Sequence, residues 1–391
     1  MENIKIDINN NKADIKLIGH IDSKNAPQLE AFMDAELGSQ EIGSVILDCS
    51  ELEYISSAGL RLILKLRKKY QDVTAVELSP EVYDIFELTG FTELLNVRKR
   101  FREISVEGCE IIGSGVNGDV YRIDDETIVK LYKNSDALSD IETERSLARK
   151  AFVKGIPTAI PYDTVKIGEY YGSVFELLNS KSLAKVLAED NSTLDTVTHL
   201  YVDLLKKIHS TEFREGELPQ MGAKALTTVD AVSPYLSEAA AEKLKRLVGT
   251  IPDDCHMVHG DYHLKNVMLQ NGEAILIDMD TISLGNPIFD FGYMFNTYVG
   301  YGELIPNNSM EFLHVPQDVC GKLYYDTIRL YFPGITEDEI NELVDKAAVL
   351  GFMRIMKRFI KKEKTEEHDR YIAICRKNIE ERVSRLDRLY I

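Results

Sequence analysis

The sequence predicts an α/β protein in which a small α/β domain precedes a larger α+β domain. Three observations lead to this prediction. Residues 1 to about 97 alternate short strand-like and helix-like segments. A basic run, Arg-Lys-Arg-Phe-Arg, follows at 98–102. We assign 98–105 to a solvated linker. The alternative is a surface that docks onto the acidic body of the protein. From about residue 106 several strands precede long helices, so the second domain is expected at 106–391.

Strands and helices are expected to alternate in the first domain. Residues 4–8 alternate apolar and polar side chains like a half-buried strand, and 44–48 form a short apolar run suited to a buried central strand. Pro80 suits the first turn of a helix, and Gly90 suits its end. The other elements expected are strands at 13–18 and 73–78 and helices at 25–37 and 57–70.

The second domain begins with strand patterns and becomes mostly helical after residue 182, apart from the segment 256–282. Near the C-terminus Thr336 and Glu339 have the spacing of a capping box at a helix start. The other expected elements are strands at 109–113, 120–123, 127–132 and 171–177 and a helix at 139–152.

Composition excludes some classes of partner and compartment. The chain has 46 basic and 64 acidic side chains and a net charge of -18, which argues against non-specific binding to nucleic acid or to an anionic membrane. This charge favours a cationic substrate only weakly. The 5 cysteines are far apart and include no C-x-x-C pair, so no disulfide framework is expected. With no signal peptide and no run of 18 apolar residues, we expect a cytoplasmic protein.

The most specific pattern is Val-His-Gly-Asp-Tyr-His-Leu-Lys-Asn at 258–266, followed by a strand-like run that leads into Asp278. Asp261 can accept the proton of an attacking hydroxyl group. Asn266 and Asp278 can hold the metal ions that offset charge on the phosphates. The order and spacing of these three residues predict phosphoryl transfer from a magnesium nucleotide.

A glycine-rich segment at 113–118 has the pattern G-x-G-x-x-G. Alone it could open a dinucleotide-binding helix, and a dinucleotide-dependent oxidoreductase is the hypothesis that follows. The alternation at 120–123, the turn at 124–125 and the β-rich run at 127–130 favour a hairpin that lies over phosphates. The candidate phosphate-binding residues of this hairpin are Gly113, Ser114, Gly115 and Gly118.

Lys130 lies at the end of the strand that follows the hairpin, where its charge could reach the α- and β-phosphates. It needs an acidic partner, and the next predicted helix offers Glu142 and Glu144. We prefer Glu144 because Leu147 and Ala148 share its helical face, but Glu142 stays an alternative.

Residues from about 106 to the C-terminus resemble the aminoglycoside phosphotransferase and choline kinase-like family, a branch of the protein-kinase-like fold. The resemblance implies a bilobal domain with an N-lobe at about 106–178, a C-lobe at about 179–391, and ATP and Mg²⁺ in the cleft. It makes Asp261 the general base and Asn266 and Asp278 the magnesium ligands, and it brings Glu176 and Leu178 to the hinge that meets the adenine. The residues that carry the resemblance are the 113–118 loop, Lys130, Glu144, His259, Gly260, Asp261, His263, Asn266, Asp278, the 284–290 segment and the 205–209 helix end.

Other residues of the motif are expected to support the site. His259 is interpreted as a structural histidine, since a zinc pair with His263 would need a helix that Gly260 breaks. Asp290 is interpreted as a buried anchor for the catalytic loop, and Asp280 either assists the metal site or lies on the surface. Only about a dozen residues separate Asp278 from Asp290, which leaves little room for a peptide-docking activation segment. We therefore expect a small hydroxylated acceptor, with Tyr293, Phe295 and Tyr298 either lining its side or buried in the core.

The segments 48–50 and 54–61 resemble the STAS domain of anti-sigma factor antagonists, and the match extends over nearly all of 1–97. In that family a partner kinase phosphorylates a serine at a helix N-terminus, and Ser57 is the aligned position. A phosphate there would meet the free N–H groups and the helix dipole. The alternative is that Ser57 is only an N-cap. Ser56 departs from the pattern, because family members often have Asp at this position.

Two functions stay open. The first is an ATP- and Mg²⁺-dependent kinase of a small hydroxylated molecule with a fused regulatory STAS domain. The second is a partner-switching signalling protein whose kinase-like domain binds nucleotide and whose STAS domain recruits a protein partner under the control of Ser57. Fold does not fix the acceptor, so aminoglycosides, choline-like alcohols, sugars and nucleosides all remain candidates.

Overall fold

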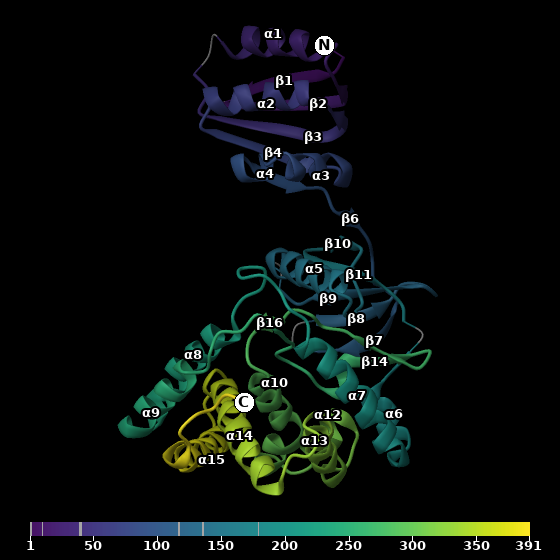
Figure 1. Cartoon of the computed structure of the whole chain (residues 1–391). Helices are drawn as coiled ribbons and strands as arrows, with labels where there is room; N and C mark the ends of the chain where they lie inside the picture. The colour runs from purple at the N-terminus through teal and green to yellow at the C-terminus, as the bar shows by residue number, and fades with distance from the viewer. Residues whose placement is uncertain (1, 10, 39–40, 116–117, 135–136, 179) are drawn as a thin grey trace. The chain divides into compact units, whose positions relative to one another are not determined.

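The computed structural model describes residues 2–9, 11–38, 41–115, 118–134, 137–178 and 180–391, which form two compact units (Figure 1). The first unit contains residues 1–105 and 164–168, and the second contains 106–163 and 169–391. Among the described residues, no helix has the length and apolar character needed to cross a membrane.

The first unit is built on a five-stranded sheet in the order β1-β2-β3-β4-β5. β1 (Ile4–Asn9) is antiparallel to β2 (Lys12–Ile21), and β3 (Ser44–Ile55), β4 (Asp72–Leu78) and β5 (Asn96–Lys99) continue the sheet in parallel. β3 is longer than the strand predicted at 44–48, because Leu52 and Ile55 continue its row of buried side chains.

The described residues of the first unit also form the helices α1 (Ala26–Leu37), α2 (Ser57–Lys69), α3 (Pro80–Leu88) and α4 (Phe91–Leu94). Gly59 lets α2 approach the sheet, since a Cβ atom there would lie 2.6 Å from Ile55 Cγ1. The segment predicted as a linker contains the end of β5 and the short strand β6 (Arg102–Glu103), which pairs in parallel with β10 (Asp163–Ile167).

The second unit begins with an antiparallel sheet and one helix. β7 (Glu110–Ser114), β8 (Gly118–Arg122), β9 (Thr127–Tyr132) and β11 (Tyr170–Glu176) pair in the order β7-β8-β9-β11, and α5 (Leu138–Val153) contacts β11. The glycine-rich segment is therefore a hairpin, as predicted, and not the start of a helix. This pairing contradicts the dinucleotide-binding alternative.

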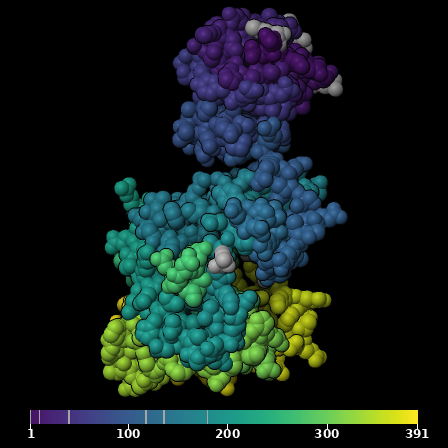
Figure 2. Space-filling view, turned by 90° about the vertical axis from the view of Figure 1, so that its right-hand side faces the viewer, coloured from purple at the N-terminus to yellow at the C-terminus, as the bar shows by residue number. Residues whose placement is uncertain are grey.

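The rest of the second unit is mainly helical, and Figure 2 shows the chain in space-filling form. Short strands within it, β13 (Met257–Val258), β14 (Val267–Gln270), β15 (Glu273–Leu276) and β16 (Ser283–Leu284), flank the predicted catalytic loop. The predicted capping box at Thr336 is present. The helices of this unit include α7 (Leu194–His209), α8 (Met221–Val232), α9 (Glu238–Gly249), α10 (Ile288–Phe295), α14 (Glu337–Ile360) and α15 (Glu366–Arg385).

Candidate active site

Lys130 lies at the centre of a group of charged side chains. Its Nζ atom is 3.1 Å from Glu144 Oε1 and 2.9 Å from Asp278 Oδ1. The Tyr132 hydroxyl donates a hydrogen bond to the same Glu144 carboxylate. Burial alone would lower the pKa of Lys130, but the charges of Glu144 and Asp278 outweigh burial and raise this pKa above its ordinary value. The lysine is therefore charged, and its helix partner is Glu144 and not the exposed Glu142.

Asp278 and Asp280 add further negative charge near Lys130. Asp278 has a φ of 64°, a left-handed conformation that is uncommon outside glycine and is enriched at functional sites. Burial, followed by the charges of Asp278 and Glu144, raises the pKa of Asp280 to about 7. Two carboxylates, Glu144 and Asp278, thus contact the ammonium group of Lys130, and Asp280 adds a third acidic group whose pKa responds to their charge.

A cavity of about 510 Å³ lies beside this cluster. Glu144 and Asp280 both border it, and the remaining lining comes from α5, from the last residue of β9 and from the residues that follow this strand. The full lining is Tyr132, Lys133, Asn134, Ala137, Asp140, Thr143, Glu144 and Asp280.

Asp290 holds the loop that carries Asp261. It is fully buried in α10, and its carboxylate accepts hydrogen bonds from the backbone N–H groups of His259 at 2.8 Å and Gly260 at 2.7 Å. His209 Nε2 lies 2.9 Å from the same carboxylate. Burial would raise the pKa of Asp290, but the hydrogen bond and charge of His209 lower it overall. A Cβ atom at Gly260, where φ is 80°, would lie 2.9 Å from the Thr281 carbonyl oxygen, so the loop needs glycine there.

The two histidines of the motif brace the same loop. His259 is fully buried, and its Nδ1 accepts a hydrogen bond from the backbone N–H of Asp261 at 3.3 Å. Burial lowers the pKa of His259, which keeps this ring neutral. His263 Nε2 lies 3.5 Å from Asp261 Oδ2.

Asp261 also contacts an arginine from a distant helix. Arg354, on α14, donates from Nη2 to Asp261 Oδ1 at 2.9 Å and from Nη1 to the Gly260 carbonyl oxygen at 2.7 Å. Burial would raise the pKa of Asp261, but the hydrogen bond with His263 and the charge of Arg354 hold it well below its usual range. Asp261 is therefore an ionised carboxylate.

Asn266 links the catalytic loop to the segment that carries Asp278. Its side-chain Nδ2 donates to the Asp261 carbonyl oxygen at 3.0 Å. Its own carbonyl oxygen accepts a hydrogen bond from the Ile277 N–H at 2.9 Å, one residue before Asp278. With Nδ2 so occupied, the amide oxygen of Asn266 remains available as a ligand atom.

The glycine hairpin is described except for residues 116 and 117, which lie outside the described part of the chain. Gly118 must be glycine, because a Cβ atom would lie 2.2 Å from the Leu131 carbonyl oxygen on β9. Gly115 N–H donates to the Gly118 carbonyl oxygen at 2.9 Å and closes the hairpin. Gly113 pairs with Val120 in the register of β7 and β8.

Ser114 and Lys133 add polar contacts to this hairpin. The Ser114 hydroxyl donates to Asp119 Oδ1 at 2.5 Å. Lys133 Nζ lies 3.1 Å from the Gly115 carbonyl oxygen and 3.2 Å from Asp119. Lys133 was not among the residues identified from the sequence.

The predicted hinge follows β11. Glu176 ends this strand opposite Thr127 and is exposed. The next residue, Leu177, donates its N–H to the Glu126 carbonyl oxygen at 2.7 Å, and Leu178 is half-buried. The carbonyl oxygen of Leu178 accepts the Ser180 N–H at 2.8 Å.

Sequence reasoning missed Arg354. It lies 93 residues after Asp261, with no motif around it, so only the fold brings the two together. A signal existed, since Arg354 is the one charged residue of the apolar stretch 347–356. Its guanidinium lies 4.3 Å from the ring centre of Tyr293. Tyr293 therefore supports Arg354, whereas the aromatic residues Phe295 and Tyr298 are buried in the core.

At the N-terminus of α2 the two serines have different environments. Ser56 is the N-cap, and its hydroxyl accepts a hydrogen bond from the Ala58 N–H at 3.2 Å. Ser57 is the first residue of the helix and is exposed. The alternative in which Ser57 is the N-cap is therefore wrong.

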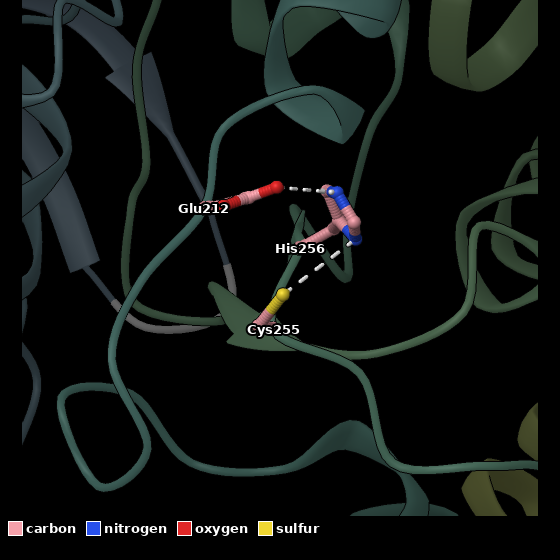
Figure 3. Close-up of side chains that lie close together, drawn as sticks. All are labelled: Glu212, Cys255 and His256. Carbon is pink, nitrogen blue, oxygen red and sulfur yellow. Dashed lines mark hydrogen bonds and ion pairs between the residues drawn. The ribbon is translucent and has the colours of Figure 1, made fainter.

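A second group of potential metal ligands, Glu212, Cys255 and His256, lies just before the catalytic loop (Figure 3). His256 Nδ1 is 2.6 Å from Asp254 Oδ1, and His256 Nε2 is 3.4 Å from Glu212 Oε1. Because both ring nitrogens already have carboxylate partners, hydrogen bonding accounts for this group without a metal.

Comparison with known proteins assigns each unit to a family. Residues 108–306 match the phosphotransferase enzyme family, and residues 3–104 match the STAS domain. The chain is 41% identical over 85 residues to BtrV of Bordetella bronchiseptica, which is described as an anti-sigma factor antagonist; the match covers 21% of this chain and 72% of that protein. It is 27% identical over 104 residues to the anti-sigma-B factor antagonist of Listeria monocytogenes, covering 25% and 90%.

Among solved structures, the ADP-bound aminoglycoside phosphotransferase APH(2'')-Ib is similar with a TM-score of 0.50. The sequences are 13% identical, and the match covers 77% of this chain and 98% of that one. At this identity the likeness concerns the fold alone. The predicted combination of a STAS-type domain and a bilobal kinase-like domain is confirmed.

Proposed function

Since the chain belongs to the phosphotransferase enzyme family and has an N-terminal STAS domain, we propose that it transfers the terminal phosphoryl group of ATP to a hydroxyl group of a small molecule. The observation that carries the proposal is the ionised carboxylate of Asp261 in a loop that is hydrogen-bonded to the other two motif residues. The Asp261 carbonyl oxygen accepts from Asn266 Nδ2, and the Asn266 carbonyl oxygen accepts from the N–H of Ile277, next to Asp278. The description of a similar fold as ADP-bound supports a nucleotide as the donor.

Asp261 would act as the general base. Its carboxylate accepts the acceptor's hydroxyl proton as the acceptor oxygen forms a bond to the γ-phosphorus and the bond from that phosphorus to the bridging oxygen of ADP breaks. Arg354 and His263 keep Asp261 ionised and fix its direction. A base with so low a pKa does little to remove the proton before the transition state, so positioning of the hydroxyl group is its main contribution.

The donor atoms suit Mg²⁺. Carboxylate and amide oxygens are the ligands that this ion prefers, and Asn266 and Asp278 offer them, with Asp280 close by. Burial, then the charges of Asp278 and Glu144, raise the pKa of Asp280, so a bound cation would favour the ionised form of this carboxyl group. Bound magnesium would offset the charge of the phosphate oxygens.

Lys130, the glycine hairpin and the hinge would bind the rest of the nucleotide. Lys130, directed by Glu144, meets the α- and β-phosphates, and the backbone N–H groups around Gly113, Ser114, Gly115 and Gly118 cover them. The backbone between Glu176 and Leu178 meets the adenine.

For the STAS domain we propose the role of a partner-binding element controlled by phosphorylation of Ser57. Ser57 is exposed at the first position of α2, where a phosphate would meet free N–H groups, and Ser56 already provides the cap. The similarity to proteins described as anti-sigma factor antagonists supports a protein partner. Phosphate mapping of the full chain after expression in its host tests this role, and a Ser57 that stays unmodified under all growth conditions counts against it.

The kinase proposal is tested by transfer of radiolabelled γ-phosphate from ATP to a library of hydroxylated metabolites. We expect Asp261→Asn to lower kcat by about 10²- to 10⁴-fold while the Kd for the nucleotide stays the same. Asp230→Asn, an exposed residue on α8 that pairs with Lys245, is the control and should behave as wild type. An Asp261→Asn enzyme as active as wild type would contradict the proposal.

A further inference from the structure

Beside Asp261, on the side formed by α8 and α14, lies a group of cations with few anionic neighbours. Lys224 extends from α8, Lys357 from α14, and Lys361 follows one turn later. Within the described part of the chain, none of the three lysines forms an ion pair with a carboxylate, although the protein carries 64 acidic residues. We call Lys224, Lys357 and Lys361 the lysine group.

Hydrogen bonds connect Lys224 to the catalytic loop through Thr281. Lys224 Nζ lies 2.8 Å from Ser283 Oγ and 3.4 Å from the Thr281 carbonyl oxygen. The Thr281 hydroxyl in turn donates to the His259 carbonyl oxygen at 2.7 Å, next to Gly260. Lys224 is thus attached to the residues that pack against Gly260, directly before the base.

Lys357 reaches the same place from the other helix. Its Nζ donates to the Thr228 hydroxyl at 3.1 Å, and Thr228 is one turn beyond Lys224 on α8. Arg354, one turn before Lys357 on α14, binds Gly260 and Asp261. The contacts therefore form a closed ring: Lys224, Thr228, Lys357, Arg354, the loop at Gly260, and back through Thr281 to Lys224.

Both lysines of this ring carry an electrostatic cost for their charged form. Partial burial, then the charges of Lys361 and Arg354, lower the pKa of Lys357. Burial also lowers the pKa of Lys224, with only Asp280 acting in the opposite direction. Like charges gathered without anionic partners destabilise a protein unless an anion joins them. Arg354 already binds Asp261, so Lys224 and Lys357 are the groups left to bind a ligand.

We propose that the acceptor is an anionic hydroxylated molecule, whose carboxylate, sulfate or phosphate group binds Lys224 and Lys357 while its hydroxyl group faces Asp261. This inference rests on the proposed kinase function and names the class of its substrate. It sets the chain apart from similar folds described as aminoglycoside phosphotransferases, because polyamines such as aminoglycosides would be repelled by the lysine group.

The nucleotide phosphates are the other anions that could occupy the lysine group. The residues proposed to hold them, Lys130, Asn266 and Asp278, come from β9 and from the segment after the base. The lysine group instead comes from α8 and α14, and its hydrogen-bond partners are Thr281 and Ser283 for Lys224 and Thr228 of α8 for Lys357. A variant at Lys357 should therefore change the KM for the acceptor and leave the KM for ATP unchanged.

The test uses the full chain and three sugars of different charge: glucuronate, with a carboxylate at C6, neutral glucose, and glucosamine, with an ammonium group at C2. We expect kcat/KM to fall in that order. Lys357→Gln should raise the KM for glucuronate roughly 10- to 100-fold, the loss of one charge-assisted hydrogen bond, with the KM for ATP unchanged. Lys377→Gln on α15 removes the same charge from an exposed surface position and is the matched control. A preference for glucosamine, or a Lys357→Gln effect on ATP instead of the acceptor, overturns the inference.

Binding of glucuronate, measured by calorimetry, separates this inference from the kinase proposal. If no sugar is phosphorylated, the proposal that the enzyme phosphorylates anionic sugars is wrong. The proposal of an anion site is then still tested by the Kd for glucuronate. Weaker binding by Lys357→Gln and unchanged binding by Lys377→Gln support the anion site. Equal binding by wild type and Lys357→Gln, or no binding by either, overturns it.

Discussion

The two sides of Asp261 carry opposite charge. On the side of β9 and Asp278, the ammonium group of Lys130 contacts the carboxylates of Glu144 and Asp278, and Asp280 adds a third acidic group. On the side of α8 and α14, the lysine group has hydroxyl and carbonyl partners and no ion-paired carboxylate among the described residues. On the acidic side carboxylates outnumber the ammonium group that they contact, whereas on the basic side Asp280 is the carboxylate whose charge acts on Lys224.

This difference shows why net charge is a poor guide to the substrate. A net charge of -18 attracts cationic partners to the protein as a whole. Composition gives no other argument about the charge of the substrate, and this one is weak. Fields at a site are set by the few charges within a Debye length of about 8–10 Å. In this site the local arrangement favours metal ions on one side of the base and an anionic acceptor on the other.

The largest expected effect concerns the anchor that both sides share. Asp290→Asn leaves the buried N–H groups of His259 and Gly260 with a weaker acceptor and His209 without its anion. Breaking a buried pair of this kind costs about 3–5 kcal/mol, so calorimetry should show the unfolding transition of the second unit at a clearly lower temperature. The surface variant Asp230→Asn should leave the Tm unchanged, and an equal Tm for both variants would refute the anchoring role.

The next effect separates the two sides. Asp278→Asn removes one carboxylate from the acidic side, so we expect kcat to fall by about 10²- to 10³-fold, with more Mg²⁺ needed for half-maximal activity. Titration of activity with MgCl₂ measures both. Lys357→Gln, on the basic side, should keep the Mg²⁺ midpoint of wild type. If both variants shift this midpoint equally, the division into two sides is wrong.

A third variant tests how the basic side controls the base. Arg354 helps to hold the pKa of Asp261 below its usual range, and Asp261 acts only when ionised. Arg354→Gln should therefore raise this pKa, so the loss of kcat/KM at acidic pH begins at a higher pH than in wild type. The depressed pKa also stabilises the fold above the unfolded value of about 3.9, and this contribution disappears as pH falls through the folded value. A pH profile with an unmoved acidic limb would exclude this role.

The smallest effect concerns Lys133 at the glycine hairpin. This side chain is half-exposed and contacts the Gly115 carbonyl oxygen. Exposed charges contribute about 0.2–1 kcal/mol, so Lys133→Gln should raise the KM for ATP only about 2- to 5-fold and leave the KM for the acceptor unchanged. Steady-state kinetics measure both KM values. A fall in activity as large as that of Asp278→Asn would mean that the acidic side extends to the hairpin.

The sequence predicted those parts of the structure that local patterns encode. The hairpin followed from alternation after Gly118, and the preference for Glu144 over Glu142 followed from helical spacing, as the contact with Lys130 shows. Both features depend on residues a few positions apart. The repeat of side-chain direction along a strand or a helix determines both features without any tertiary contact.

The sequence did not predict the basic side. Arg354 and Lys357 lie in a helix that reaches Gly260 and Asp261 only through the packing of α14 against α8 and α10. No spacing rule connects residues 93 positions apart. Similarly, whether Ser56 or Ser57 is the N-cap depends on a difference of one residue in the start of α2, and sequence patterns do not locate a helix start so closely.

The most direct test is a crystal structure of the full chain with Mn²⁺, ADP and glucuronate, with the manganese located by its anomalous scattering. The account predicts an anomalous peak within ligand distance of Asp278 and Asn266, and the glucuronate carboxylate on Lys224 and Lys357. Manganese bound away from Asp278, or a carboxylate bound outside the lysine group, would contradict the opposite roles assigned to the two sides of Asp261.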